Sequence, residues 1–392
     1  MKYMRSKSLG LTAMLAAGAV ISGTALAADM PPSMNGVLKK LGLTTAVLKN
    51  SANELAVPAA WVAAAKKEGT LRVRLNLAEK NFNKLVKPFH ERYPYIKTEF
   101  TRAVGADRAV KPLLAFKAGR YIADMTMGIS GKFTDYLAAG AMENLKDMPS
   151  WSKIPKELRH PDGHFGAYGI VNWCMSYNTK KVKKSELPAT WSEMIHDAKW
   201  RGGRVGSANR PQLWLIMIWG EKGEKYAKDL MGDFFSVLKP QLRKEAINGM
   251  MKLASIGEVD LAMPSAGYRV KLQVARGAPI AFHCPEPVPT AAADVVVFKG
   301  GPRVNSAKIF VNWLTSIEGQ LALHAADGTR PSHVDLASLS SVMPYPDAVK
   351  GKKLAYRTLD LTLNQMKPMF KAWNKSWQAA GGPARKKRKK KR

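Results

Sequence analysis

The residues between Ser207 and Pro211 combine a polar loop, a guanidinium group and a proline, and together these suit the binding of an anion. Proline is favoured at the first position of a helix, and serine or asparagine, here Ser207 or Asn209, is favoured at the cap before it. Free backbone N–H groups at such a helix start attract an anion, and Arg210 offers two parallel donors for a phosphate or carboxylate. An ordinary capped helix with a solvated arginine explains the same residues, so the sequence leaves both interpretations open.

Residue patterns typical of enzymes are absent from the sequence. It contains no C-x-x-C pair, no H-E-x-x-H pair, no phosphate-binding P-loop and no nucleophile elbow. The seven histidines show no metal-ligand spacing, and the closest pair, His160 and His164, is expected in a turn. We therefore expect neither catalytic activity nor a bound cofactor.

Strand-like and helix-like segments alternate along the chain, which is typical of an α/β fold with a largely parallel sheet. The helix predicted over residues 81–93, for example, places Phe82, Leu85, Val86 and Phe89 on one face. Other predicted helices cover residues 61–68, 109–117, 132–139, 211–219, 221–231, 241–254, 267–275, 306–314 and 350–377. Predicted strands cover residues 70–77, 96–101, 123–129, 170–175, 203–207, 257–263, 279–284 and 294–298.

One block of the chain, residues 168–203, carries a specific resemblance. It contains YGIVNWCMSYNT, then P-A-T-W and then K-W-R-G-G. These motifs resemble the extracellular solute-binding proteins of ABC importers, in the branch that holds the ferric-iron-binding proteins. The segments AAKKEGTLRV, FHERYPYIKTEF, KAGRYIADM, LAAGAMENL and VNSAKIFVNWLTSIEGQLAL extend the resemblance, in order, over about residues 60–345.

The resemblance implies a two-lobed periplasmic-binding-protein fold of type II, with discontinuous lobes, hinge strands and a cleft between the lobes. A hinge of this kind closes around its ligand. On this basis residues 59–174 and 284–345 form lobe 1, and residues 175–283 and 346–380 form lobe 2. Residues 28–58 form an extension ahead of lobe 1.

The family binds its solute with loops at the carboxyl ends of strands, as open α/β sheets generally do. Matched position by position, the cleft is expected to receive Asn76, Ser130, Ser207, Asn209, Arg210, Tyr268 and Arg269. Arg102, after the second predicted strand, either faces the cleft or lies on the surface. Ferric relatives place two adjacent tyrosines where this chain has only Tyr268, flanked by Gly267 and Arg269. One phenolate beside a cation suits a trivalent metal poorly, so Tyr268 is the single metal candidate and an anionic solute fits better.

The N-terminus has the composition of a cleavable secretion signal. Lys2, Arg5 and Lys7 precede a small apolar stretch over residues 9–21, and Ala25-Leu26-Ala27 forms the cleavage pattern. We therefore expect residues 1–27 to be removed on export to the periplasm. An exported chain can oxidise its cysteines, and the resemblance puts Cys174 and Cys284 near the lobe crossovers. They are expected either as a disulfide or as two buried thiols.

The chain is strongly basic, with a formal net charge of +32, and residues 385–392 are all lysine or arginine. Such a tail cannot bury enough apolar surface to fold, so residues 381–392 are expected to be disordered. The tail either adheres to an anionic envelope surface or is a solvated arm without function. The leading hypothesis is a monomeric solute-binding component that delivers a small anionic solute to an ABC permease. A ferric-binding protein, a basic envelope adhesin or scaffold, and an exported nucleic-acid binder are the alternatives.

Overall fold

The computed structural model describes residues 30–129 and 132–384, arranged around a sheet with the strand order β2-β1-β3-β9-β4-β7-β5-β6. Strand β10 pairs with β9, and β8 pairs with β4. The strands are β1 (Leu71–Leu75), β2 (Thr98–Arg102), β3 (Met125–Met127), β4 (Gly166–Asn178), β5 (Val205–Ala208), β6 (Gln241–Arg243), β7 (Leu261–Ala266), β8 (Ile280–His283), β9 (Val288–Val297) and β10 (Leu354–Tyr356).

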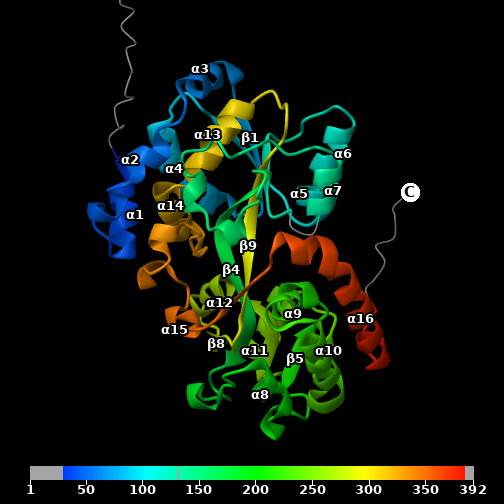
Figure 1. Cartoon of the computed structure of the whole chain (residues 1–392). Helices are drawn as coiled ribbons and strands as arrows, with labels where there is room; N and C mark the ends of the chain where they lie inside the picture. Colours follow the sequence, from blue (N-terminus) through cyan, green and yellow to red (C-terminus); the bar gives the residue numbers. More distant parts are fainter. Residues whose placement is uncertain (1–29, 130–131, 385–392) are drawn as a thin grey trace, which may run out of the picture.

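The central strand β4 belongs to both halves of this sheet. Its first half pairs antiparallel with β9, from Gly166 opposite Val295 to Asn172 opposite Thr290. Its second half pairs antiparallel with β7 and β8. Strands β1, β2 and β3 are parallel on one side, and β5, β6 and β7 are parallel on the other. The sheet is therefore mixed, because the two parallel parts are joined by antiparallel crossover strands. Figure 1 shows β4 and β9 running between an upper and a lower lobe.

Helices cover the β1–β2–β3 part of the sheet to form the upper lobe. The amphipathic pattern in α4 is confirmed, because Phe82, Leu85, Val86 and Phe89 are all buried. They join one apolar core with residues of α1, β1, α13 and α14. The helices of this lobe are α3 (Ala59–Glu68), α4 (Glu79–Arg92), α5 (Ala106–Ala109), α6 (Lys111–Lys117), α7 (Phe133–Ala138), α13 (Val304–Thr315) and α14 (Ile317–Asp327).

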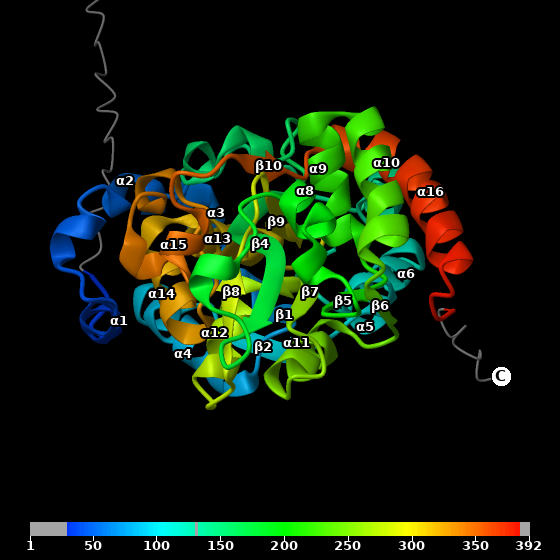
Figure 2. The same cartoon turned by 90° about the horizontal axis from the view of Figure 1, so that it is seen from below.

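The lower lobe has helices on both faces of its strands. Seen from below, α8, α9 and α10 lie on one side of β7 and β5, while α11 and α12 lie on the other (Figure 2). One apolar core of this lobe contains six tryptophans: Trp191, Trp200, Trp214, Trp219, Trp373 and Trp377. The helices are α8 (Trp191–His196), α9 (Leu215–Lys222), α10 (Glu224–Asp233), α11 (Ile247–Ser255), α12 (Gly267–Val274), α15 (Pro346–Val349) and α16 (Met366–Ala379).

The segment ahead of α3 packs against the upper lobe. It contains α1 (Ser33–Leu41) and α2 (Ser51–Leu55). The Glu54 carboxylate accepts a hydrogen bond of 2.8 Å from the backbone N–H of Ile317, at the start of α14. The Glu54 carbonyl accepts another from the amide of Asn312, also at 2.8 Å. A negative charge is favourable at a helix N-terminus, so this contact anchors the extension.

Three local predictions are wrong. Residues 241–243 were expected in a helix but form β6, which pairs with β5 through Gly206 and Gln241. The helix expected from Pro211 begins as a 3₁₀ turn, Pro211–Leu213, and α9 starts only after Trp214. The expected final helices include the short strand β10.

Several expectations fall on residues that the structure does not describe. The secretion signal over residues 1–27, Ser130 and the basic residues 385–392 all lie outside the described residues. Within the described ranges, no helix combines the length and apolar character needed to span a membrane.

Candidate solute-binding site

A small cavity lies where the crossover strand β4 meets elements of both lobes. It is lined by residues 170–172 of β4, by Gly267 and Tyr268 at the start of α12, and by Arg330 after α14. Phe282 and Tyr345 add aromatic rings to its wall, with ring centroids 5.4 Å apart. Its volume of about 10 Å³ is roughly the room that one water molecule needs.

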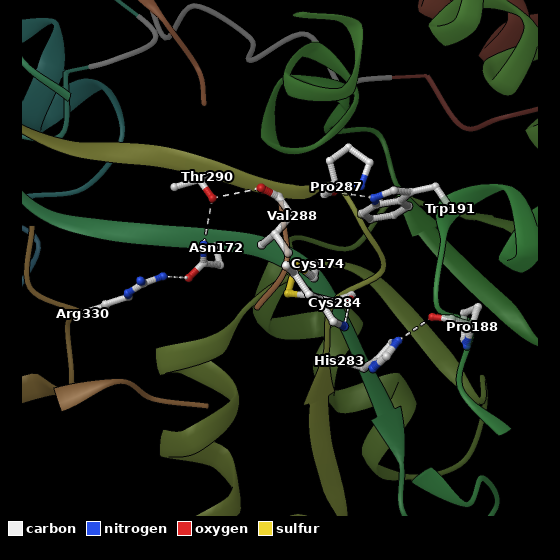
Figure 3. Close-up of a disulfide and its surroundings, with 11 residues drawn as sticks. Asn172, Cys174, Pro188, Trp191, His283, Cys284, Pro287, Val288, Thr290 and Arg330 are labelled. Atoms are coloured by element: carbon white, nitrogen blue, oxygen red, sulfur yellow. Dashed lines mark hydrogen bonds between the residues drawn. A yellow bond between two sulfur atoms is a disulfide. The ribbon is translucent and has the colours of Figure 1, made fainter. Parts of the chain in front are cut away.

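Arg330 is the charged group of this cavity, and its side chain is tied to both crossover strands. The guanidinium Nη1 donates to the Asn172 side-chain oxygen at 3.0 Å, and the Asn172 amide donates to the Thr290 hydroxyl at 3.0 Å. The Thr290 hydroxyl in turn donates to the carbonyl of Val288 at 2.9 Å. Figure 3 shows this chain of hydrogen bonds from Arg330 across β4 to β9. Burial lowers the pKa of Arg330.

Tyr268 and Arg269 form a pair at the start of α12. The Arg269 Nε donates to the Tyr268 hydroxyl at 2.9 Å, and the guanidinium carbon lies 5.5 Å from the centre of the tyrosine ring. A second donor of Arg269 reaches the Asn248 side chain at 3.1 Å. Both residues are partly buried, and Tyr268 lines the cavity. The tyrosine hydroxyl is thus held by a cation.

The surroundings of this pair contain further ionisable groups of the upper lobe. Burial raises the pKa of Tyr168, and an electrostatic interaction with Tyr268 raises it further. Burial likewise raises the pKa of Asp327, which the charge of Arg269 partly offsets. Burial lowers the pKa of Arg357, which interacts with Asp294.

A disulfide joins Cys174 on β4 to Cys284, directly after β8 (Figure 3). Of the two possibilities that the sequence left open, the structure has the disulfide. Its first cysteine is two residues from Asn172, so it closes a covalent link immediately beside the hydrogen-bond chain of Arg330. The crossover region is therefore held by covalent and polar links together.

Comparison with known proteins decides the family. A family model described as bacterial extracellular solute-binding protein matches residues 122–356, which is more than half of the chain. The chain belongs to this family. The resemblance found in the sequence is thereby confirmed.

Related proteins and structures agree with the fold of this solute-binding protein. An uncharacterized protein of Haemophilus influenzae is 25% identical over 255 residues, covering 60% of this chain and 69% of the relative. Iron-bound HitA from Pseudomonas aeruginosa is 18% identical, with a TM-score of 0.61, covering 78% of this chain and 99% of HitA. IdiA (FutA) from Trichodesmium, in complex with iron and citrate, is 16% identical, with a TM-score of 0.65 and 80% and 100% coverage. AfuA from Actinobacillus pleuropneumoniae, with fructose-6-phosphate bound, is 19% identical, with a TM-score of 0.58 and 80% and 99% coverage.

The loop from Ser207 to Arg210, which the sequence predicts as an anion site, makes hydrogen bonds to other groups of the protein. Ser207 is fully buried, and its hydroxyl lies 3.5 Å from the carbonyl oxygen of Ala208. The Asn209 side-chain oxygen accepts from the indole N–H of Trp373 at 3.0 Å. Arg210, not serine or asparagine, precedes the 3₁₀ turn, and no side chain caps it. These three residues do not line the cavity around Tyr268 and Arg330.

The remaining predicted residues are only partly brought together. Tyr268 lines the cavity and Arg269 holds its hydroxyl, but Asn76 and Arg102 are exposed at the ends of β1 and β2. Sequence reasoning missed Arg330 and Asn172. Asn172 left a signal, because it is a polar residue within the apolar segment 170–175. Arg330 left none, because nothing in its neighbours distinguishes it from a surface arginine.

Within the described residues, one group of side chains has the donor types of a metal site: Glu54, His333 and Asp335. The His333 Nδ1 accepts from the backbone N–H of Asp335 at 3.2 Å, so Nε2 carries the proton and faces Glu54 at 3.0 Å. The ammonium of Lys153 lies 2.8 Å from Asp335. The Lys153 ammonium, which also lies 4.0 Å from Glu54, already occupies the position of a cation beside these carboxylates and links the N-terminal segment to the upper lobe.

Proposed function

We propose that this protein is the solute-binding component of an ABC importer. It captures a small anionic solute between its lobes and presents it to a membrane permease. The observation that carries the proposal is the cavity at the crossover, where β4, the start of α12 and the segment after α14 meet. A ligand that binds between two hinged lobes commonly brings the lobes together into a closed form.

The cations of the site favour an anion. Arg269 and Arg330 approach the cavity from different lobes, while the nearby carboxylate of Asp327 has its pKa raised by burial. A positively charged cleft with low-dielectric walls concentrates anions and speeds their capture. The high net charge of the chain acts in the same direction over a longer range.

Ferric iron is the second candidate, because structural neighbours with the same fold hold iron. One feature of this chain opposes it. The hydroxyl of Tyr268 already accepts a hydrogen bond from the guanidinium of Arg269. A trivalent ion needs ionised oxygen ligands and is repelled by a neighbouring cation. This chain therefore fits an anion better than a bare ferric ion.

A thermal-shift screen of the mature protein tests the proposal. The panel contains acetate, succinate, inorganic phosphate, glycerol 3-phosphate, ferric citrate, spermidine and glycerol. A ligand that binds only the folded state raises the melting temperature, by an amount set by its concentration relative to Kd. We expect a carboxylate or phosphate compound to raise it and glycerol to leave it unchanged. The proposal fails if no compound in this or a wider metabolite panel binds.

A further inference from the structure

Arg330 differs from Arg92, another largely buried arginine, in the charge of its partner. Arg92, whose side chain is 6% exposed, forms a two-pronged ion pair with the buried Glu318. Arg330, at 8% exposed, has one side-chain hydrogen bond within the part of the chain that the structure describes, to the neutral side chain of Asn172. Within residues 30–129 and 132–384, no carboxylate forms an ion pair with it. A buried cation without a counterion is unfavourable unless another group supplies the negative charge.

Its location indicates where that charge comes from. Arg330 lines the cavity at the crossover, and the hydrogen bond to Asn172 uses its Nη1. Tyr268, Phe282 and Tyr345 also line this cavity. The cavity thus offers a cationic end and an aromatic wall, which suits a small organic molecule that has one anionic group.

We infer that Arg330 is the anion-binding residue of this protein, and that it takes the carboxylate or phosphate group of a small organic solute. The inference deepens the proposed function and rests on it. A guanidinium binds either group through two parallel hydrogen bonds, so the shared chemistry is an oxyanion. Asn172 is a positioning residue, because its side-chain oxygen holds the guanidinium and its amide is fixed by Thr290.

The position of Asn172 links the anion to the hinge. Asn172 and Thr290 are directly paired residues of β4 and β9, the strands that cross between the lobes. An anion that draws the guanidinium toward itself competes with the Asn172 oxygen for the same group. Solute binding then changes a hydrogen bond made by residues of both crossover strands. In this way a bound solute can change how the two lobes are arranged.

Two substitutions test the inference, each with a matched control. Arg330→Gln removes the charge, and Asn172→Asp places an internal carboxylate about where the Asn172 oxygen now lies, 3.0 Å from the guanidinium. The internal carboxylate neutralises Arg330 without changing the shape of the site. The controls are Arg276→Gln and Asn374→Asp, since both residues are exposed and lie outside the cavity.

The measurement is isothermal titration with acetate, succinate, inorganic phosphate and glycerol 3-phosphate, whose relative affinities distinguish a carboxylate from a phosphate. Both test variants should bind the probe that the unmodified protein prefers roughly 30-fold or more weakly. The controls should bind it normally. Asn172→Asp loses the hydrogen bond from residue 172 to the Thr290 hydroxyl but gains an ion pair with Arg330, so its melting temperature should stay at or above that of the unmodified protein. If Asn172 had only a structural role, lost binding would come with lost stability.

The possible failures are distinguishable. Unchanged affinity in Arg330→Gln and Asn172→Asp would overturn the role of Arg330 and leave the importer proposal standing. Binding of spermidine alone would overturn the anionic class and also leave the importer standing. Absence of any bound solute, both in titration and in native mass spectrometry of the purified protein, would overturn both.

Discussion

Replacing Arg330 by methionine should cost little folding stability, whereas the same replacement at Arg92 should cost a great deal. Arg92 neutralises Glu318, whose side chain is 1% exposed and accepts one further hydrogen bond, from Trp313 at 2.7 Å. Removal of one partner of a buried ion pair leaves an uncompensated charge and costs about 3–5 kcal/mol. Each lost kcal/mol lowers the melting temperature of a lobe of this size by roughly 2–4 °C.

At Arg330 two effects of opposite sign nearly cancel. The substitution leaves the buried oxygen of Asn172 without its donor, which costs about 1–3 kcal/mol. It also removes a buried cation that has no ion-pair partner among the described residues, and relief of buried charge contributes about 1–4 kcal/mol. The central values of the two ranges differ by about 0.5 kcal/mol, so the expected net change in unfolding free energy is within about 1 kcal/mol of zero.

Calorimetry of the solute-free variants checks this pair of values. Bound solute is first removed by washing the immobilised protein in denaturant and refolding it, since a ligand would stabilise the unmodified protein alone. We expect Arg92→Met to melt roughly 10 °C lower and Arg330→Met to melt within about 2 °C of the unmodified protein. Equal losses in the two variants would refute the argument, because Arg330 would then stabilise the fold as Arg92 does.

Three further predictions concern other parts of the chain. Replacing both Cys174 and Cys284 by serine should lower the unfolding free energy by about 2–5 kcal/mol, measured by urea titration, and unchanged stability would show that the disulfide adds nothing. Burial lowers the pKa of His283 to about 4, while its ring donates to the carbonyl of Pro188 at 2.7 Å. The unfolded state therefore binds more protons below pH 6.5, and up to about 3 kcal/mol of stability is lost between pH 6.5 and 4. His283→Gln should flatten that part of the stability–pH curve, and an equally steep curve would contradict the assignment. Deletion of residues 385–392 should leave solute affinity unchanged but abolish binding to anionic vesicles or DNA at low salt, if the tail has an adhesive role.

Local patterns predicted many elements because they depend on near neighbours along the chain. The apolar spacing in residues 81–93 predicted α4, and Gly69 and Pro94 correctly indicated the ends of α3 and α4. Residues 241–243 were assigned wrongly, because pairing with β5 overrides their local preference. The break before α9 has a similar origin. Trp214 is fully buried and stacks against Trp191, and its backbone is not helical.

Prediction of the candidate site from the sequence has the same limits as prediction of the fold. Tyr268 was predicted from the family resemblance, and it lines the cavity. The loop from Ser207 to Arg210 has the residue types of an anion site, and anion binding there stays a prediction. The hydrogen bond from Trp373 of α16 to Asn209 could not be predicted, because Trp373 lies 164 residues further along the chain.

The sequence by itself determined the family, the alternation of strands and helices, and the placement of Cys174 near the crossover of the lobes. These features lie in motifs and periodicities that extend over a few residues or one turn. Only the tertiary structure decided that Arg330 lies against Asn172, 158 residues away, without a carboxylate beside it among the described residues. The physical reason is that the charge balance of a buried group depends on long-range packing, which no local pattern encodes.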